Sequence, residues 1–170
     1  MRLLIAAATA AVLATPGLAG EWTGAYVGLG VGSTDIDGPG AADGDDVTYG
    51  IHAGYDYDFG DWVVGGELEY DRTDINLGNG VAVADNIGRL KFKAGYDFGD
   101  ILGYAVVGAA RAQTSIGDDT GAVYGLGLAY AVNERFTISG ELLRHDFNNF
   151  NGLGSDLTAN SVNIRASYRF

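Results

Sequence analysis

A strict alternation of apolar and polar residues is the dominant pattern of this chain. Every second residue from Val47 to Phe59 is apolar or aromatic, and the residues between them are polar or glycine. Segments 87–98, 122–132 and 161–170 repeat this pattern. A period of two is typical of a β-strand with two different faces and not of a helix. The sequence therefore predicts a chain built from strands.

Four less regular segments complete a predicted set of eight strands. They are residues 22–33, 62–73, 101–113 and 135–147. In the third of these we expect Tyr104 and Val106 to face outward and Arg111 to face inward. Each strand has about ten residues or more, which suffices to cross a bilayer when the strand is tilted.

The connections between these strands alternate in length. Short turns are expected at 59–61, 98–100 and 132–134, and long loops near 34–46, 72–86, 114–120 and 148–157. Short turns at one end and long loops at the other are typical of outer-membrane barrels. A soluble sandwich or lipocalin-like barrel stays open as an alternative, because periodicity alone does not say which face points inward.

An internal repeat marks the ends of the even-numbered strands. Residues 53–56 read Ala-Gly-Tyr-Asp and recur at 94–97, and more loosely at 128–130. Each copy places an aromatic residue at the same height, which favours an aromatic girdle at a membrane interface over a soluble sheet.

The first nineteen residues differ from the rest. Arg2 precedes an apolar run that ends at Leu13, and small residues precede a predicted cleavage after Ala19. This arrangement is typical of a secretory signal peptide, and the run is too short to span a bilayer. We expect a cleaved segment 1–19 and a barrel domain 20–170. The remaining charge of −13 argues against a nucleic-acid partner, and the absence of cysteine excludes disulfides and thiolate chemistry.

The C-terminal segment carries one resemblance to a known class of protein. Residues 162–170 alternate as Val-x-Ile-x-Ala-x-Tyr-x-Phe, which resembles the last strand of Gram-negative outer-membrane proteins. In that class the final aromatic is read by the assembly machinery. The resemblance implies that Tyr168 and Phe170 form such a signal.

Two further segments resemble the outer membrane protein β-barrel domain family of porin-like and opacity-protein-like surface proteins. They are residues 22–28 and 125–142, although Ala129 and Leu142 depart from the family's usual residues. The resemblance spans the chain after residue 19. It implies an all-β, eight-stranded antiparallel up-and-down transmembrane barrel in the cell outer membrane, with the lipid bilayer and the assembly machinery as partners.

Charged residues on the predicted inward faces are the candidate site. They are Glu67, Glu69, Asp71, Arg89, Lys91, Lys93, Arg111, Glu141 and Arg165. A symmetric hairpin would place Asp71 opposite Arg89, Glu69 opposite Lys91 and Glu67 opposite Lys93. An eight-stranded barrel is only wide enough for side chains, and buried charge must be paired. We therefore predict a plug of salt bridges, with a narrow proton or ion path as the alternative.

Catalysis and metal binding find little support. Lipid A deacylases resemble the chain near His145, but their serine is replaced by Phe147, and Ser139 is six residues away, roughly 20 Å along a strand. Aspartates in the long loops invite a divalent cation but lack an EF-hand pattern. They are Asp35, Asp37, Asp43, Asp45, Asp46, Asp118 and Asp119.

These observations predict a non-catalytic structural or surface-interaction barrel, without cofactor or metal, that meets an unknown extracellular partner. The alternatives are a small-solute or ion pore and, less favoured, a lipid A-modifying enzyme.

Overall fold

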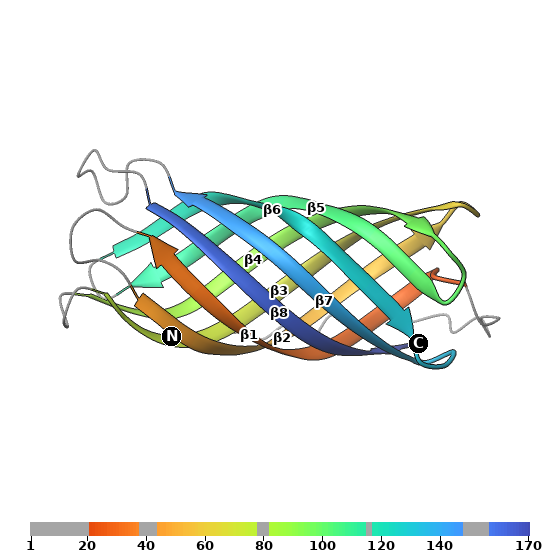
Figure 1. Ribbon diagram of the computed structural model, residues 1–170, viewed down its shortest axis with the longest axis horizontal. Coiled ribbons are helices and arrows are strands. Elements are labelled where there is room, and N and C mark those ends of the chain that lie inside the picture. The colour runs from red at the N-terminus through yellow and green to blue at the C-terminus, as the bar shows by residue number, and fades with distance from the viewer. Residues whose placement is uncertain (1–20, 38–43, 78–81, 115–116, 148–156) are drawn as a thin grey trace, which may run out of the picture.

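The computed structural model of the chain describes residues 21–37, 44–77, 82–114, 117–147 and 157–170, with side chains over 21–34, 47–72, 86–111, 120–146 and 158–170. It contains eight strands (Figure 1). They are β1 (Gly24–Asp37), β2 (Gly44–Asp58), β3 (Trp62–Leu77), β4 (Ala82–Asp97), β5 (Ile101–Thr114), β6 (Gly117–Ala131), β7 (Phe136–Phe147) and β8 (Leu157–Arg169). The predicted signal peptide lies outside the described residues.

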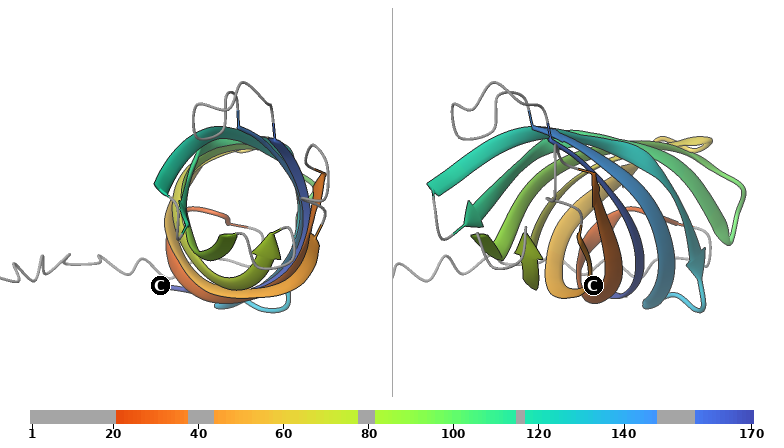
Figure 2. Two further views of the ribbon diagram at one scale, coloured as in Figure 1. Left: turned by 90° about the vertical axis from the view of Figure 1, so that its left-hand side faces the viewer. Right: turned by 60° about the vertical axis from the view of Figure 1, so that its left-hand side comes forward.

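The strands form one closed barrel in chain order. Each strand pairs antiparallel with the next, and β8 pairs with β1, where Val31 lies opposite Ile164. Figure 2 shows this ring end-on. The predicted eight-stranded antiparallel barrel is confirmed. Over the described residues, no helix is long and apolar enough to cross a membrane.

The strands continue further toward the long connections than the alternation predicts. Residues 34–37, 44–46, 72–77, 82–86 and 117–120 were expected in loops and are strand. Their backbone ladders continue, for example from Ser33 opposite Val47 to Ile36 opposite Gly44. These extensions lack the apolar alternation, so the pattern that reveals the other strands is missing there.

The outer wall of the barrel is apolar. Leu29, Leu126 and Ile164 are 66%, 66% and 62% exposed, while inward neighbours such as Glu141 are buried. A soluble barrel turns its apolar face inward. The soluble alternative is therefore wrong for this chain, because its exposed face suits lipid and not water.

Strand β5 corrects one sequence prediction. Tyr104 and Val106 are buried and point inward, whereas Arg111 is exposed on the outer wall. Both faces of β5 are apolar along most of its length, so the alternation does not identify the inner face. The ladder does so, because Tyr104 lies opposite Gly127, where a Cβ would be only 2.3 Å from the Tyr104 ring.

Aromatic side chains gather where the short turns join the strands. Trp62 packs edge-on against Tyr96 with ring centroids 5.5 Å apart, and Phe136 packs against Tyr168 at 5.3 Å. In the turns, the N–H groups of Gly60 and Gly99 donate to Asp58 and Asp97 Oδ1, both at 2.7 Å. Both glycines have positive φ, which side chains rarely adopt. The aromatic band therefore marks the turn end of the barrel.

Candidate functional site in the barrel interior

The register between β3 and β4 differs by two residues from the symmetric prediction. Glu67 lies opposite Lys91, Glu69 opposite Arg89, and Asp71 opposite Ile87. The ladder pairs Arg72 with Asn86, and counting from that pair gives the observed partners, while a β-bulge between Arg72 and Ile75 shifts the register by one residue only nearer the loop. The predicted direct pairings are therefore wrong. Asp71–Arg89 and Glu69–Lys91 nevertheless form as diagonal ion pairs.

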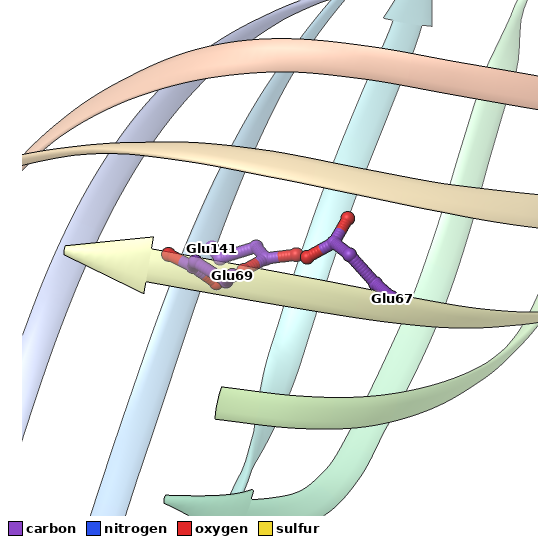
Figure 3. Close-up of side chains that lie close together, drawn as sticks. All are labelled: Glu67, Glu69 and Glu141. Carbon is purple, nitrogen blue, oxygen red and sulfur yellow. The ribbon is translucent and has the colours of Figure 1, made fainter. Parts of the chain in front are cut away.

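Lys91 is the centre of the interior network. Its Nζ lies 2.7 Å from Glu67 Oε1 and 2.8 Å from Glu141 Oε2, and it also contacts Glu69. Figure 3 shows the three carboxylates meeting, with Glu67 and Glu69 on β3 and Glu141 on β7. Because Lys91 is on β4, this cluster joins opposite walls of the barrel.

Arg165 on β8 makes a second link across the same centre. Its guanidinium lies 2.6 Å from Glu67 Oε1 and 2.5 Å from Glu141 Oε1. Tyr26 donates its hydroxyl to Glu67 Oε2 and Tyr104 donates to Glu141 Oε1, both at 2.8 Å. Each carboxylate is therefore held from two or more strands, as a buried charge requires.

A second group lies toward the loop end. Arg89 contacts Asp71 and, at 3.2 Å, Glu69 Oε1, and its Nε donates to His145 Nε2 at 2.9 Å. The sequence identifies His145 as inward-facing but does not connect it with Arg89.

A third group, toward the turn end, holds residues that the sequence analysis did not place in the network. Lys93 reaches Asp56 Oδ1 at 3.0 Å instead of Glu67. It does so across Gly65 on β3, where a Cβ would lie 2.1 Å from Asp56 and 3.0 Å from Lys93. Arg169 pairs with Asp56 Oδ2 at 3.2 Å. The alternation of the sequence places both Asp56 and Arg169 on the inner face of the barrel, and this pattern could have identified them.

Trp22 covers the turn end of this group. Its side chain is 2% exposed, and its Nε1 donates to Asp97 Oδ1 at 3.1 Å. Its backbone N–H donates to Asp58 Oδ2 at 3.2 Å, and Arg169 lies over the ring with 5.5 Å to the centroid. Trp22 thereby ties the turns after β2 and β4 to the last strand.

The ion pairs of the described interior join equal numbers of positive and negative groups. Five carboxylates face five cations, all buried except for the slightly accessible Lys93. They are Asp56, Glu67, Glu69, Asp71 and Glu141, and Arg89, Lys91, Lys93, Arg165 and Arg169. An internal cavity near Trp22 and Tyr104 has a volume of only about 20 Å³, room for roughly one water.

The arrangement does not favour a metal ion. Carboxylate oxygens of Glu67, Glu69 and Glu141 lie within 4.8 Å of one another, a spacing that suits a cation. Lys91 Nζ contacts all three, so the ammonium group already supplies the positive charge at that point.

A serine–histidine pair was missed by the sequence analysis. His52 Nε2 lies 2.8 Å from Ser167 Oγ, and both residues are buried. A nucleophile needs an adjacent base, which this pair supplies, but it also needs room for a substrate. Ser167 lines an interior cavity of only about 20 Å³, which is too small for one. Both residues also contribute to the lining of a groove of about 630 Å³ beside the outward-facing Leu29 and Ile51, but their side chains are buried on the inner face, away from a substrate in that groove.

The residues of two other sequence predictions do not belong to the interior network that the structure describes. Arg111 is on the outer wall, so its assignment to the network is corrected. The side chains of all seven loop aspartates, from Asp35 to Asp119, lie outside the described residues.

These features define a class of protein: an eight-stranded antiparallel barrel with an apolar outer wall and an interior filled by paired charges. The chain belongs to the outer membrane protein beta-barrel domain family, whose model matches residues 3–170. It is an outer-membrane barrel. No curated protein matches the chain.

Solved structures share this fold at low identity. Neisserial surface protein A is 16% identical with a TM-score of 0.63, over 87% of this chain and 98% of that chain. Ail, the attachment invasion locus protein of Yersinia pestis, is 16% identical with a TM-score of 0.62, over 87% and 99%. A structure of Ail with the heparin analogue sucrose octasulfate is 20% identical with a TM-score of 0.61, over 87% and 99%.

Proposed function

We propose that this protein is a non-catalytic structural and surface-interaction barrel whose interior is closed to solutes by paired side chains. The observation that carries the proposal is the buried cluster of Lys91 and Arg165 with Glu67, Glu69 and Glu141. An ion that crossed the barrel would have to displace these pairs, and buried pairs are costly to break. Two of the structural neighbours are named for attachment and for the surface.

Planar-bilayer conductance of the refolded protein tests the closed interior. We expect silence or rare brief openings from the unaltered chain. Steady ohmic channels would support the alternative of a small-solute or ion pore. Lys91→Ala combined with Arg165→Ala removes two central cations and should raise the frequency of openings, whereas the outer-wall variant Leu126→Ala should leave it unchanged.

The enzyme alternative can be tested at the Ser167–His52 pair. A fluorophosphonate reagent labels an activated, accessible serine. We expect no Ser167-dependent labelling of the folded barrel, because the Ser167 side chain is buried on the inner face and the interior cavity beside it holds about one water. Labelling that disappears in Ser167→Ala would support an enzyme instead.

We further propose that the long connections face the cell exterior and the short turns face the periplasm. Protease added to intact cells should then cut only in the long connections. Cleavage at the Phe59–Asp61 turn in sealed cells would contradict this orientation.

The C-terminal residues are proposed to guide assembly. Phe170 is 48% exposed, and its N–H donates to Ala25 O at 3.0 Å, which leaves the ring available on the outer wall. Deletion of Phe170 should lower outer-membrane levels while export stays intact, measured as heat-modifiable barrel in the membrane fraction. Phe136→Ala is a control that removes another exposed aromatic from the same end. Unchanged levels after deletion would exclude this role for Phe170.

A further inference from the structure

The chain bends sharply just before its first strand. Residues 21–23 precede β1 and belong to no strand. Gly24, the first residue of β1, has a φ of +144°, which residues with a side chain rarely adopt. The red start of the described chain lies at the turn end in Figure 1 and inside the ring in the end-on view of Figure 2. Gly24 therefore permits a bend at which residues 21–23 leave the wall and cross the turn end of the barrel.

The side chain of Trp22 fills this end of the interior. It is 2% exposed and shares one apolar cluster with residues of three strands. These are Val63 of β3, Leu102 of β5 and Ala129 of β6. Arg169 of β8 lies over the indole ring, with 5.5 Å to its centroid. Because these four strands are distributed around the barrel, the ring has partners on several sides of the opening.

Hydrogen bonds fasten residues 21–23 to two of the short turns. The N–H of Trp22 donates to Asp58 Oδ2 at 3.2 Å, and the N–H of Asp58 donates to Thr23 Oγ1 at 3.0 Å. The indole Nε1 of Trp22 donates to Asp97 Oδ1 at 3.1 Å and to the carbonyl oxygen of Gly99 at 3.3 Å. A segment held in this way, outside the strand ladders, can open locally while the barrel stays closed.

Charged groups lie directly beneath the Trp22 ring. The side chain of Lys93 is 13% exposed and pairs with the fully buried Asp56. Trp22 and Ser139 both line the interior cavity of about 20 Å³. The cluster around Lys91 lies further from the turns, because Lys91 precedes Lys93 on β4. Removal of the ring would therefore expose the cavity and the Asp56–Lys93 pair to the turn end, with the central cluster still in place.

From the bend, the ring and the hydrogen bonds together, we propose that residues 21–23 form a lid, hinged at Gly24, that seals the turn end of the barrel. Water and small polar solutes reach the Asp56–Lys93 pair from this end only when the lid lifts. The lid is a second barrier in addition to the central cluster, and it rests on the proposed function only in that this cluster keeps the barrel closed to conduction when the lid is open.

Thiol accessibility tests the lid, because the chain contains no cysteine. Ser139→Cys places a single thiol beneath the lid, and Ser161→Cys places one in the interior toward the loop end. Both serines are buried. Each is combined with Trp22→Ala, Trp22→Phe or Gly24→Ala, and Trp62→Ala is the matched control that removes an outer tryptophan near the same end. The measurement is the rate of alkylation by iodoacetamide, followed by mass spectrometry of the refolded protein in detergent.

We expect the thiol at position 139 to react slowly beneath the intact lid. Trp22→Ala should accelerate the reaction about tenfold or more, because a reaction through a locally open state follows the population of that state. Trp22→Phe keeps a ring but loses the Nε1 donor, so its effect should be smaller. Gly24→Ala should also accelerate the reaction, although Trp22 is intact, because it strains the bend. None of these changes should affect the thiol at position 161, and Trp62→Ala should affect neither thiol.

Three outcomes would overturn the proposal. Equal rates at position 139 with and without Trp22 would mean that the ring does not control access. An equal acceleration at position 161 would mean that loss of Trp22 loosens the whole barrel. No acceleration by Gly24→Ala would exclude the hinge.

Two further measurements keep this test separate from others. Heat-modifiable mobility confirms that each variant is closed, and Trp22→Phe and Gly24→Ala decide the matter if Trp22→Ala does not close. Planar-bilayer conductance separates the lid from the proposed function. A Trp22→Ala protein that stays silent while the thiol at position 139 reacts faster would support both. Steady channels from the unaltered chain would contradict the closed interior, whereas a thiol at position 139 that reacts rapidly in a silent, unaltered barrel would contradict the lid alone.

Discussion

Leu90 and Lys91 are neighbours on β4, yet they lie in opposite environments. Leu90 is 46% exposed on the outer wall, whereas Lys91 is 2% exposed among three carboxylates. The same contrast runs along most of the barrel, with apolar residues outside and charged or small residues inside. Exposure therefore means contact with lipid here, and burial means contact with other polar side chains.

The two faces also differ in what stabilises them. The outer face needs only apolar side chains of any shape, because acyl chains adapt to it. The inner face needs specific partners, because each buried charge must meet an opposite charge or a hydrogen-bond donor. The stability of the barrel should therefore depend on the identity of each side chain on the inner face, and mainly on its polarity on the outer face.

The largest expected effect is on the inner face. Lys91→Glu would place a fourth carboxylate beside Glu67, Glu69 and Glu141. Breaking a buried pair costs about 3–5 kcal/mol, and reversing the charge should cost at least that much. Urea unfolding of the refolded protein in lipid vesicles measures the loss. Adding Glu69→Lys should recover part of it, and no recovery would contradict the network described above.

Leu90→Lys tests the same contrast on the outer face. A lysine that faces lipid costs about 2–4 kcal/mol near the bilayer midplane and less near an interface. The same unfolding measurement applies. No interior substitution should rescue this variant, since position 90 has no interior neighbours. A harmless Leu90→Lys would mean that the outer wall does not face lipid.

Glycine substitutions test how tightly the inner face is packed, and we expect a smaller loss of stability from them. An added Cβ at Gly108 would lie 2.1 Å from the Leu90 carbonyl oxygen, whereas Gly88 has open space around it. Overpacking typically costs about 1–3 kcal/mol, so Gly108→Ala should destabilise the barrel by that amount. Gly88→Ala is the matched control and should change the free energy of unfolding little. An equally small effect of Gly108→Ala would show that the inner wall has spare room at that position.

The number of strands and most of their faces could be predicted from the period of two, because each strand separates lipid from a polar interior. Strand β5 was the exception. Its inner face carries Leu102, Tyr104 and Val106, so polarity does not distinguish its two sides. Only the ladder to β6 decides between them, and no local pattern reveals that ladder.

The members of the charge network were largely predictable, but their partners were not. Glu67 and Glu69 each lie opposite the cation two residues nearer the loop than the predicted one, and no residue pattern in the two strands marks this register. Lys93 finds Asp56 two strands away because Gly65 leaves the space between them open. Such contacts depend on which small residues lie between two charges, and this becomes visible only once three strands are aligned.

The two tryptophans offer a spectroscopic test of the two faces. Substitution of the outer tryptophan, Trp62, should change the stability of the barrel little. Trp22 is 2% exposed inside the barrel, and Trp62 is 59% exposed on the outer wall. Lipids with brominated acyl chains quench only tryptophans that they contact. Trp22→Phe, which keeps Trp62, should be strongly quenched in such vesicles, and Trp62→Phe, which keeps Trp22, should be quenched weakly or not at all. Heat-modifiable mobility checks that Trp22→Phe still closes, because Trp22 bonds to Asp97. Strong quenching of the Trp62→Phe protein would place Trp22 in lipid, and the turn end of the barrel would then be open.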